Sequence, residues 1–178
     1  MPDIAYIVGI LGRFQSNPRE AHWNAAKKVL WYLQRTKSYM LVYGKDKGLE
    51  ISGYTNSDLA EDLNERKSTG GYVFLLGGGA ISWKSAKQTI IATLTIEAEF
   101  VAWLCSLLCK DNKRTSASRL MDVKFLKVKE KVEEGTIDVQ HLNTSMMVAD
   151  PFTKALLVGI FKLQVSRMGI LENFDQWE

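Results

Sequence analysis

Residues 71–83 have the sequence GYVFLLGGGAISW, and this stretch predicts two strands joined by a tight turn. Aromatic and branched side chains favour strands over residues 71–76 and 80–83. The three glycines between them, residues 77–79, are typical of a hairpin turn, which needs positive φ angles. The glycine run lacks the following Lys-Ser/Thr and helix of a phosphate-binding loop, so a hairpin explains it better.

The sequence before this hairpin predicts more of the same sheet. Residues 49–54 alternate between apolar and polar side chains, and residues 39–43 are rich in aromatic and aliphatic side chains, so both are predicted as strands. Residues 55–69 are polar and are predicted as a loop. The centre of the chain is therefore expected to be a hairpin-rich sheet.

Two helices are predicted at the N-terminal end. Residues 3–15 are mainly apolar, and Asn17-Pro18 is a signal for a second helix that ends near Arg35, with Asn17 as its N-cap. This second helix spaces its apolar side chains by three and four residues: Trp23, Ala26, Leu30 and Leu33. Two explanations stay open for them, packing in the core or a surface on which nucleic-acid bases stack.

After the sheet the pattern becomes helical. Helices are predicted over residues 96–109 and 122–132, the latter ended by Gly135, and an amphipathic helix opens at residues 150–154. Residues 136–140 predict one more short strand. Together the elements predict a mixed α+β domain, with a sheet followed by helices.

The composition is that of a globular protein. The chain has 178 residues, of which 46% are hydrophobic and 24% charged, which excludes disorder as the main state. The formal net charge of +3 permits nucleic-acid binding without arguing for it.

Cysteine usage and the N-terminus bear on the compartment. Cys105 and Cys109 lie four residues apart, on one face of a predicted helix, and predict neither a disulfide framework nor a metal site. The N-terminal residues lack the basic segment of a secretory signal, and no apolar run reaches the ~18 residues that span a membrane. We therefore predict a cytoplasmic or nuclear protein that is not secreted and has no membrane partner.

Acidic residues lie near the predicted ends of several elements: Asp58, Asp62, Glu97, Glu99, Asp111 and Asp150. Carboxylates brought together from separate elements repel one another unless cations hold them. Three or four of them at the edge of a sheet are typical of a Mg²⁺ site that hydrolyses phosphodiesters. The alternative is that they are solvated surface acids.

Two groups of motifs cover nearly the whole chain. The first comprises Pro2-Asp3-Ile4-Ala5-Tyr6, Asn17-Pro18 and His22-Trp23. The second comprises Gly53-Tyr54-Thr55, Arg66-Lys67-Ser68-Thr69, residues 71–74 and 77–85, residues 95–100, Val148-Ala149-Asp150 and Phe152-Thr153-Lys154. The first group resembles the end of the reverse transcriptase region of copia-type retrotransposon Pol polyproteins, and the second resembles their ribonuclease H domain.

This resemblance implies a fold and a function. Residues 1–38 would be the helical end of a reverse transcriptase, and residues 39–178 a ribonuclease H-like domain, a mixed sheet flanked by helices. In that family four acidic residues bind two Mg²⁺ ions, which drive hydrolysis of the RNA strand of an RNA–DNA hybrid. The expected partner is therefore such a hybrid or another nucleic acid.

Matched position by position, the resemblance implies a catalytic and metal-binding set of Asp58, Glu99, Asp111 and Asp150. Asn56 occupies the family's first acidic position, and its neutral amide cannot bridge two divalent ions as a carboxylate does. Asp58 lies two residues further on, on the same strand face and roughly 6–7 Å away. Replacement of the lost carboxylate by Asp58 stays an alternative.

The chain is also shorter than the resemblance requires around residues 101–120. Only residues 100–110 separate Glu99 from Asp111, too few for both the helix and the strand that precede this Asp in the family. We expect residues 96–109 to form a helix and the strand before the third acidic residue to be missing. A strand at residues 107–110 would contradict this.

These departures predict a truncated, degenerate fragment with impaired hybrid hydrolysis. The alternative is a non-catalytic nucleic-acid-binding module that uses the basic residues 113–131. Its phosphate contacts would be Lys124, Lys127, Lys129 and Lys131. The sequence predicts no oligomeric state.

Overall fold

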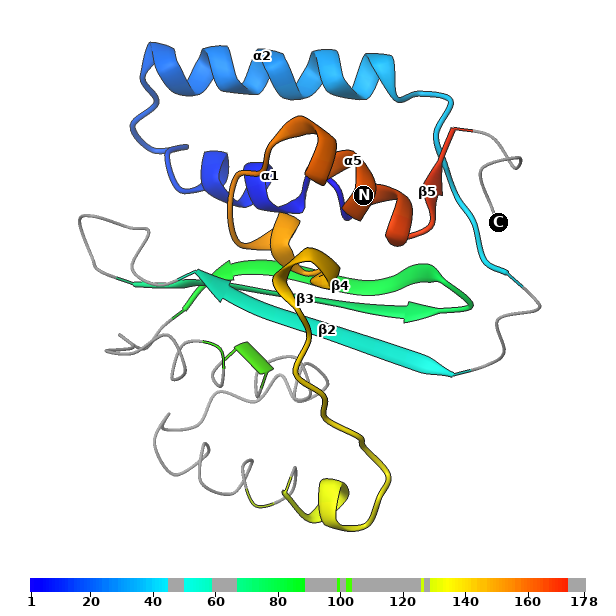
Figure 1. Ribbon diagram of the computed structural model, residues 1–178. Coiled ribbons are helices and arrows are strands. Elements are labelled where there is room, and N and C mark those ends of the chain that lie inside the picture. The colour runs from blue at the N-terminus through cyan, green and yellow to red at the C-terminus, as the bar shows by residue number, and fades with distance from the viewer. Residues whose placement is uncertain are drawn as a thin grey trace.

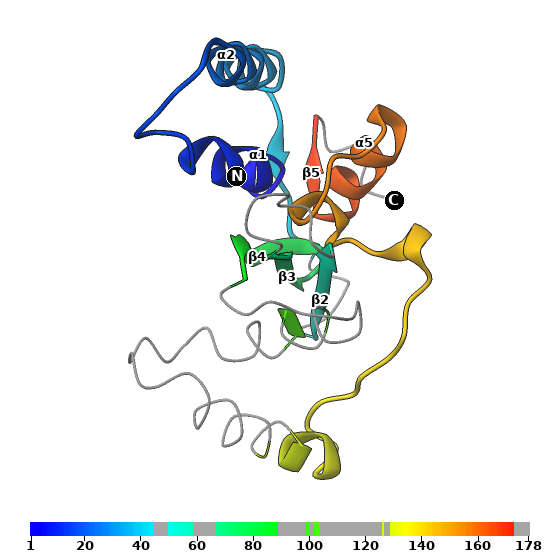
Figure 2. The same ribbon diagram turned by 90° about the vertical axis from the view of Figure 1, so that its left-hand side faces the viewer.

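The structure, a computed structural model, describes residues 1–44, 50–58, 67–88, 99, 102–103, 126 and 129–172. In chain order its labelled elements are α1 (Ala5–Gly12), α2 (Glu20–Arg35), β1 (Met40–Leu41), β2 (Ile51–Asp58), β3 (Thr69–Leu76), β4 (Gly79–Lys87), the 3-10 helices η2 (Thr144–Met146) and η3 (Asp150–Phe152), α5 (Val158–Arg167) and β5 (Ile170–Leu171). In Figures 1 and 2, α1 and α5 lie between the main sheet and α2. The predicted mixed α+β fold, a sheet flanked by helices, is confirmed.

The main sheet is an antiparallel meander in the order β2-β3-β4. The predicted hairpin joins β3 to β4, with Leu76 paired to Gly79 across the turn. Gly77 and Gly78 form the turn with φ angles of +55° and +76°, a backbone conformation that favours glycine. The glycine run therefore acts as a turn, as its sequence predicts.

The strands are longer than their apolar patterns predict. β2 continues through Asp58 and β4 through Lys87, so the prediction of a loop from residue 55 is wrong, and the strand predicted to end at residue 83 is too short. Thr69 explains both extensions, because it is paired with Asp58 on one side and with Lys87 on the other. The continued pairing satisfies the backbone groups of these polar ends, which a pattern of side chains does not reveal.

Both N-terminal helices form, but α2 starts later than predicted. Its N-cap is Arg19, whose backbone N–H donates to Nδ1 of His22 at 3.0 Å. The prediction of Asn17 as N-cap is therefore wrong. No residue of α2 is buried, and Trp23 and Leu30 are 63% and 59% exposed. The structure thus contradicts core packing as the explanation for these two side chains.

The core forms where η3 and α5 pack on β3. Its buried side chains come from residues 73–80 and 148–170: Val73, Leu75, Ala80, Val148, Ala149, Phe152, Val165, Met168 and Ile170. Phe152 and Met168 are the largest fully buried side chains of the described residues. The short strands β1 and β5 close this core, with Met40 paired to Leu171 and Leu41 to Ile170.

Two further predictions fall on described residues. The strand predicted at residues 136–140 is wrong, because these residues have no ladder partner in the described part of the chain. Gly135 ends the preceding helical turns with a φ of +69°, as predicted. The last helix is split: η3 opens at Asp150, and α5 begins only at Val158.

Several predictions lie outside the described residues. They concern Asp62, Glu97, both cysteines, Asp111, Lys124, Lys127, and the strand or helix at residues 107–110. The division of the chain at residue 38 stays a prediction. Over the residues that the structure describes, no helix has the length and apolar character needed to span a membrane.

Candidate functional site

The residues of the candidate site come from β2 and η3, which lie against each other on one face of the sheet. Gly71 of β3 permits this approach, because a Cβ atom added there would lie 2.3 Å from Cβ of Phe152 in η3. Gly71 is paired with Asn56 of β2. The missing side chain therefore lets η3 settle on the sheet and places Asp150 beside Asn56.

The carboxylate of Asp150 is almost fully buried, and both of its oxygens have partners within the chain. Oδ1 accepts a hydrogen bond from Nδ2 of Asn56 at 2.5 Å. Oδ2 lies 3.1 Å from Nζ of Lys154, four residues further along. A buried carboxylate requires such partners, because an uncompensated charge away from water is very costly. The charge of Asp150 is thus already balanced by this chain.

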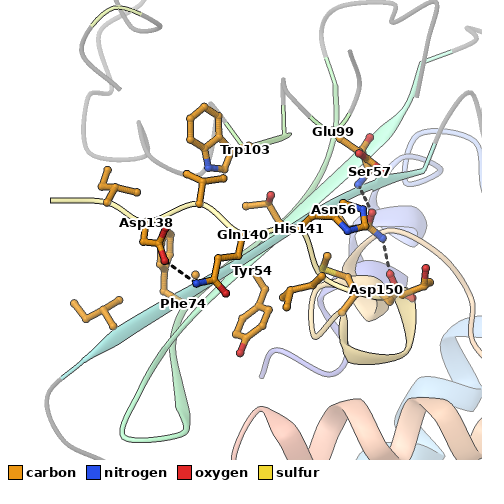
Figure 3. Close-up of a pocket in the computed structure, with 18 of the residues that line it drawn as sticks. Tyr54, Asn56, Ser57, Phe74, Glu99, Trp103, Asp138, Gln140, His141 and Asp150 are labelled. Atoms are coloured by element: carbon orange, nitrogen blue, oxygen red, sulfur yellow. Dashed lines mark hydrogen bonds between the residues drawn. The ribbon is translucent and has the colours of Figure 1, made fainter. Parts of the chain in front are cut away.

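The orientation of the Asn56 amide is fixed by its other hydrogen bonds. Oδ1 of Asn56 accepts from the backbone N–H of Ser57 at 2.8 Å, so Nδ2 must be the atom that faces Asp150. Nδ2 also donates to Oγ1 of Thr153 at 3.2 Å, and the Thr153 hydroxyl donates to the backbone carbonyl of Asp150. Figure 3 shows the amide between Ser57 and Asp150. We call Asn56, Asp150, Thr153 and Lys154 the amide network.

The amide network borders an open hollow of about 1310 Å³ on the face of β2 (Figure 3). Residues 135–142 line the hollow as well, and they include Asp138, Gln140 and His141. Glu99 and Trp103, two described helical residues that follow β4 in the chain, also line it. The hollow is large and open enough to admit an extended ligand.

A comparison with curated proteins identifies relatives of the chain by sequence similarity. The retrovirus-related Pol polyprotein from transposon TNT 1-94 of Nicotiana tabacum is 32% identical over 97% of this chain. The chain is a homologue of transposon Pol polyproteins. A second Pol polyprotein, from transposon RE2 of Arabidopsis thaliana, is 28% identical over 96% of the chain. No family model matches the chain, and no solved structure matches it.

This Pol homologue spans only 15% of the length of the tobacco polyprotein and 14% of the Arabidopsis one. The alignment with the tobacco polyprotein runs over 203 positions, more than the 178 residues of the chain. That relative therefore has residues within the matched region that this chain lacks. A shorter relative, named secreted RxLR effector protein 161 of Plasmopara viticola, is 44% identical over 57% of this chain and 71% of its own length.

In this Pol homologue the predicted acidic residues are only partly brought together. Glu99 and Asp150 line the same hollow as Asn56. Asp58 lies at the end of β2, paired with Thr69, and is not among the residues that line the hollow. Asp111 lies outside the described residues. The described geometry therefore gives no support to the alternative that Asp58 takes over the role of the carboxylate missing at Asn56.

The donor set around Asp150 does not fit a divalent cation. A metal ion needs free carboxylate oxygens, whereas these oxygens face the N–H of an amide and an ammonium group. The described residues also contain no group of three or more His, Cys, Asp or Glu side chains that could hold a metal ion. The described part of this Pol homologue thus offers no built Mg²⁺ site.

The basic residues predicted to contact phosphates are partly described. Lys129 and Lys131 lie in exposed helical turns and pair with Glu133 at 3.6 Å and Glu134 at 2.5 Å. The hydrogen bond that Nζ of Lys131 donates to the carboxylate of Glu134 raises the pKa of Lys131. Lys124 and Lys127 lie outside the described residues. Both described cations are therefore engaged by acids of their own helix.

Two members of the amide network were not predicted as site residues. Thr153 and Lys154 follow Asp150 directly, within the motif Phe152-Thr153-Lys154. The spacing of Lys154 from Asp150, four residues, is the signal that would have paired them. The role of Thr153 depends on its contact with Asn56, 97 residues away, for which the sequence has no signal.

Proposed function

We propose that this chain is a ribonuclease H-like segment of a copia-type Pol polyprotein whose catalytic site is closed by the amide network. The single observation that carries the proposal is the 2.5 Å hydrogen bond from Nδ2 of Asn56 to Oδ1 of Asp150. In the family that the chain resembles, both positions are carboxylates that share Mg²⁺. Here an amide and a lysine take over the role of the cations.

Electrostatics supports this proposal. Two facing carboxylates are stable only with a cation between them, whereas an amide and a carboxylate attract each other directly. Lys154 adds a positive charge that is part of the chain. The arrangement therefore stabilises the fold without metal and removes the ligand that hydrolysis would need.

The comparisons support the same proposal at a coarser level. Three relatives that match between 95% and 97% of the chain are Pol polyproteins from transposons. The alignment that exceeds the length of this chain agrees with an internally shortened copy. A shortened copy that has also lost a metal-binding carboxylate is expected to keep its packing and lose its chemistry.

The test is cleavage of a labelled RNA–DNA hybrid in Mg²⁺, using the native chain and Asn56→Asp. We expect no cleavage by the native chain above a buffer control. Mg²⁺-dependent cleavage by the native chain would overturn the proposal. Cleavage by Asn56→Asp alone would support it and identify the amide as the only lesion.

A matched control separates the site from a general effect of added charge. Asn17 is exposed and lies outside every helix and strand, so Asn17→Asp makes the same chemical change away from β2. We expect this variant to behave as the native chain does. The basic stretch 113–131 is not proposed as a second function, because its described lysines are engaged by acids.

A further inference from the structure

The outward face of α2 carries a surface that the proposed function does not use. Trp23, Leu30 and Trp31 are each about 60% exposed, although tryptophan and leucine are usually buried. Both views show α2 at the outer side of the molecule, farther from the sheet than α1 and α5 (Figures 1 and 2). Large apolar side chains gathered on an exposed face are typical of a binding surface.

Helix geometry explains why these side chains face outward. Trp23, Lys27 and Trp31 are four residues apart and therefore form one row along the helix. Val29 and Tyr32, which are both half-buried, lie on the other side of α2, where Tyr32 contacts Phe161 of α5. The helix thus has an inner face that packs on the molecule and an outer row of alternating aromatic and basic residues.

The charge of this segment is strongly positive. Residues 19–37 contain a single acidic residue, Glu20. The same residues contain five cationic side chains: Arg19, Lys27, Lys28, Arg35 and Lys37. Among the residues that the structure describes, none forms an ion pair with Lys27, Lys28 or Arg35. Cations without acidic partners beside exposed indole rings are suited to bind a nucleic acid, whose phosphates are negative and whose bases can stack on the indoles.

We infer that the row Trp23–Lys27–Trp31 of α2 binds single-stranded nucleic acid, with bases stacked on the two indoles and phosphates held by Lys27, Lys28 and Arg35. A single strand is favoured over a duplex, because indole rings stack on bases that are free of neighbours. About 12 Å separates the two tryptophans along the helix axis, so each ring meets a different base. The inference does not depend on whether the amide network is catalytically silent.

Other occupants fit this face less well. A membrane surface needs a continuous apolar face, whereas Lys27 stands in the middle of this row. The core of a protein interface is depleted in lysine for the same reason, the cost of desolvating its charge. A second copy of the chain would bring two basic helices together and so place like charges in contact.

The test measures binding of the full chain to a fluorescein-labelled oligo-deoxythymidine of about 20 nucleotides by anisotropy, in EDTA so that no metal-dependent cleavage occurs. We expect Trp23→Leu with Trp31→Leu to weaken binding at least about tenfold, because leucine is apolar but cannot stack. Trp23→Phe with Trp31→Phe should stay within a few-fold of the native chain. Val158→Ala, an equally exposed apolar position on α5, should change nothing.

Salt and competing probes decide the remaining outcomes. Each of Lys27→Ala and Lys28→Ala should reduce the slope of log affinity against log salt by roughly 0.7. Unchanged affinity of the double leucine variant, folded by circular dichroism, would overturn the inference. So would tighter binding to a hairpin duplex or to phosphatidylserine vesicles than to the oligonucleotide, or a doubling of mass in light scattering that the leucine variant abolishes.

Discussion

The hydroxyl of Tyr32 donates a hydrogen bond of 2.7 Å to Oδ2 of Asp3, and this bond ties α2 to the start of the chain. Asp3 is 4% exposed, and its other oxygen has no hydrogen-bond partner in the described part of the chain. The tyrosine is therefore the described group that compensates a buried carboxylate. A contact between two side chains 29 residues apart thus fixes how α2 is placed on the rest of the molecule.

Removal of this hydroxyl should lower stability. We expect Tyr32→Phe to reduce the free energy of unfolding by about 1–2 kcal/mol, since a hydrogen bond to a charged group is lost and Tyr32 is only half-buried. Urea denaturation at pH 7 measures this. Tyr43→Phe is the matched control, because the Tyr43 hydroxyl donates to a neutral carbonyl, that of Ala80, at 3.0 Å. An equal loss in both variants would contradict the special role of Asp3.

The same pair predicts a response to alkaline pH. Burial, and then the hydrogen bond to Asp3, raise the pKa of Tyr32 above its ordinary value near 10. The unfolded chain therefore ionises this tyrosine first, and the stability from the pair is present below pH 10 and lost as pH rises above it. Denaturation midpoints measured from pH 8 to 11 should fall less steeply in Tyr32→Phe than in the native chain. If the two plots of denaturation midpoint against pH run parallel, the Tyr32–Asp3 pair is not the cause of the loss of stability at alkaline pH.

Asn56→Asp should destabilise the chain without metal and make it respond to Mg²⁺. The new carboxylate would face Asp150 at the position where Nδ2 now donates, so we expect a loss of about 2–3 kcal/mol at pH 7. Added Mg²⁺ should recover part of this loss by binding only the folded state. Thermal denaturation with and without Mg²⁺ measures both effects. The native chain should show no such recovery, and a native response equal to that of the variant would contradict the closed site.

Lys154→Met should test the ammonium of the amide network. Asp150 is 5% exposed at its side chain, so loss of Lys154 leaves a buried charge with fewer partners, and we expect a loss of about 1–2 kcal/mol. Lys129→Met is the matched control, because the Lys129–Glu133 pair is exposed and should contribute less than about 0.5 kcal/mol. Urea denaturation of both variants provides the comparison. Equal effects would place Asp150 in an environment that solvent reaches freely.

Gly71→Ala should separate η3 from the sheet. Its Cβ would lie 2.3 Å from Cβ of Phe152, which is fully buried and cannot move aside, so we expect a loss of about 2–3 kcal/mol. Gly159→Ala in α5 meets no atom within 4 Å and should be neutral or stabilising by up to about 1 kcal/mol. If Gly71→Ala is tolerated as well as Gly159→Ala, η3 does not hold its described position.

The sequence predicted the parts of the fold that depend on local chemistry. Gly77 and Gly78 supply the positive φ angles of a hairpin, and the apolar spacing of residues 3–15 and 23–33 supplies two helices, because these signals act within a few residues. The late start of α2 was missed because a histidine side chain accepts the hydrogen bond that Asn17 was expected to accept. The ends of β2 and β4 were missed because strand pairing, not side-chain polarity, extends them.

The candidate site could be predicted only at its separate positions. The resemblance pointed to Asn56 and Asp150, but their hydrogen bond joins residues 94 apart in sequence. This hydrogen bond forms only because Gly71 has no side chain, and Gly71 is neither of the two residues that the bond joins. Lys154 was within reach of a local argument, since it lies four residues from Asp150, whereas Thr153 was not.

The core described above draws its buried side chains from residues 73–80 and 148–170. Asp150 lies within the second stretch, two residues before Phe152, whose side chain is fully buried. The acidic residue of the candidate site and a central residue of the core therefore belong to one short segment. Substitutions that disturb this segment are penalised because they weaken folding, whether or not the chain has any activity. Persistence of residues 148–154 in copies of this element is thus explained by the fold and is no record of a persisting activity.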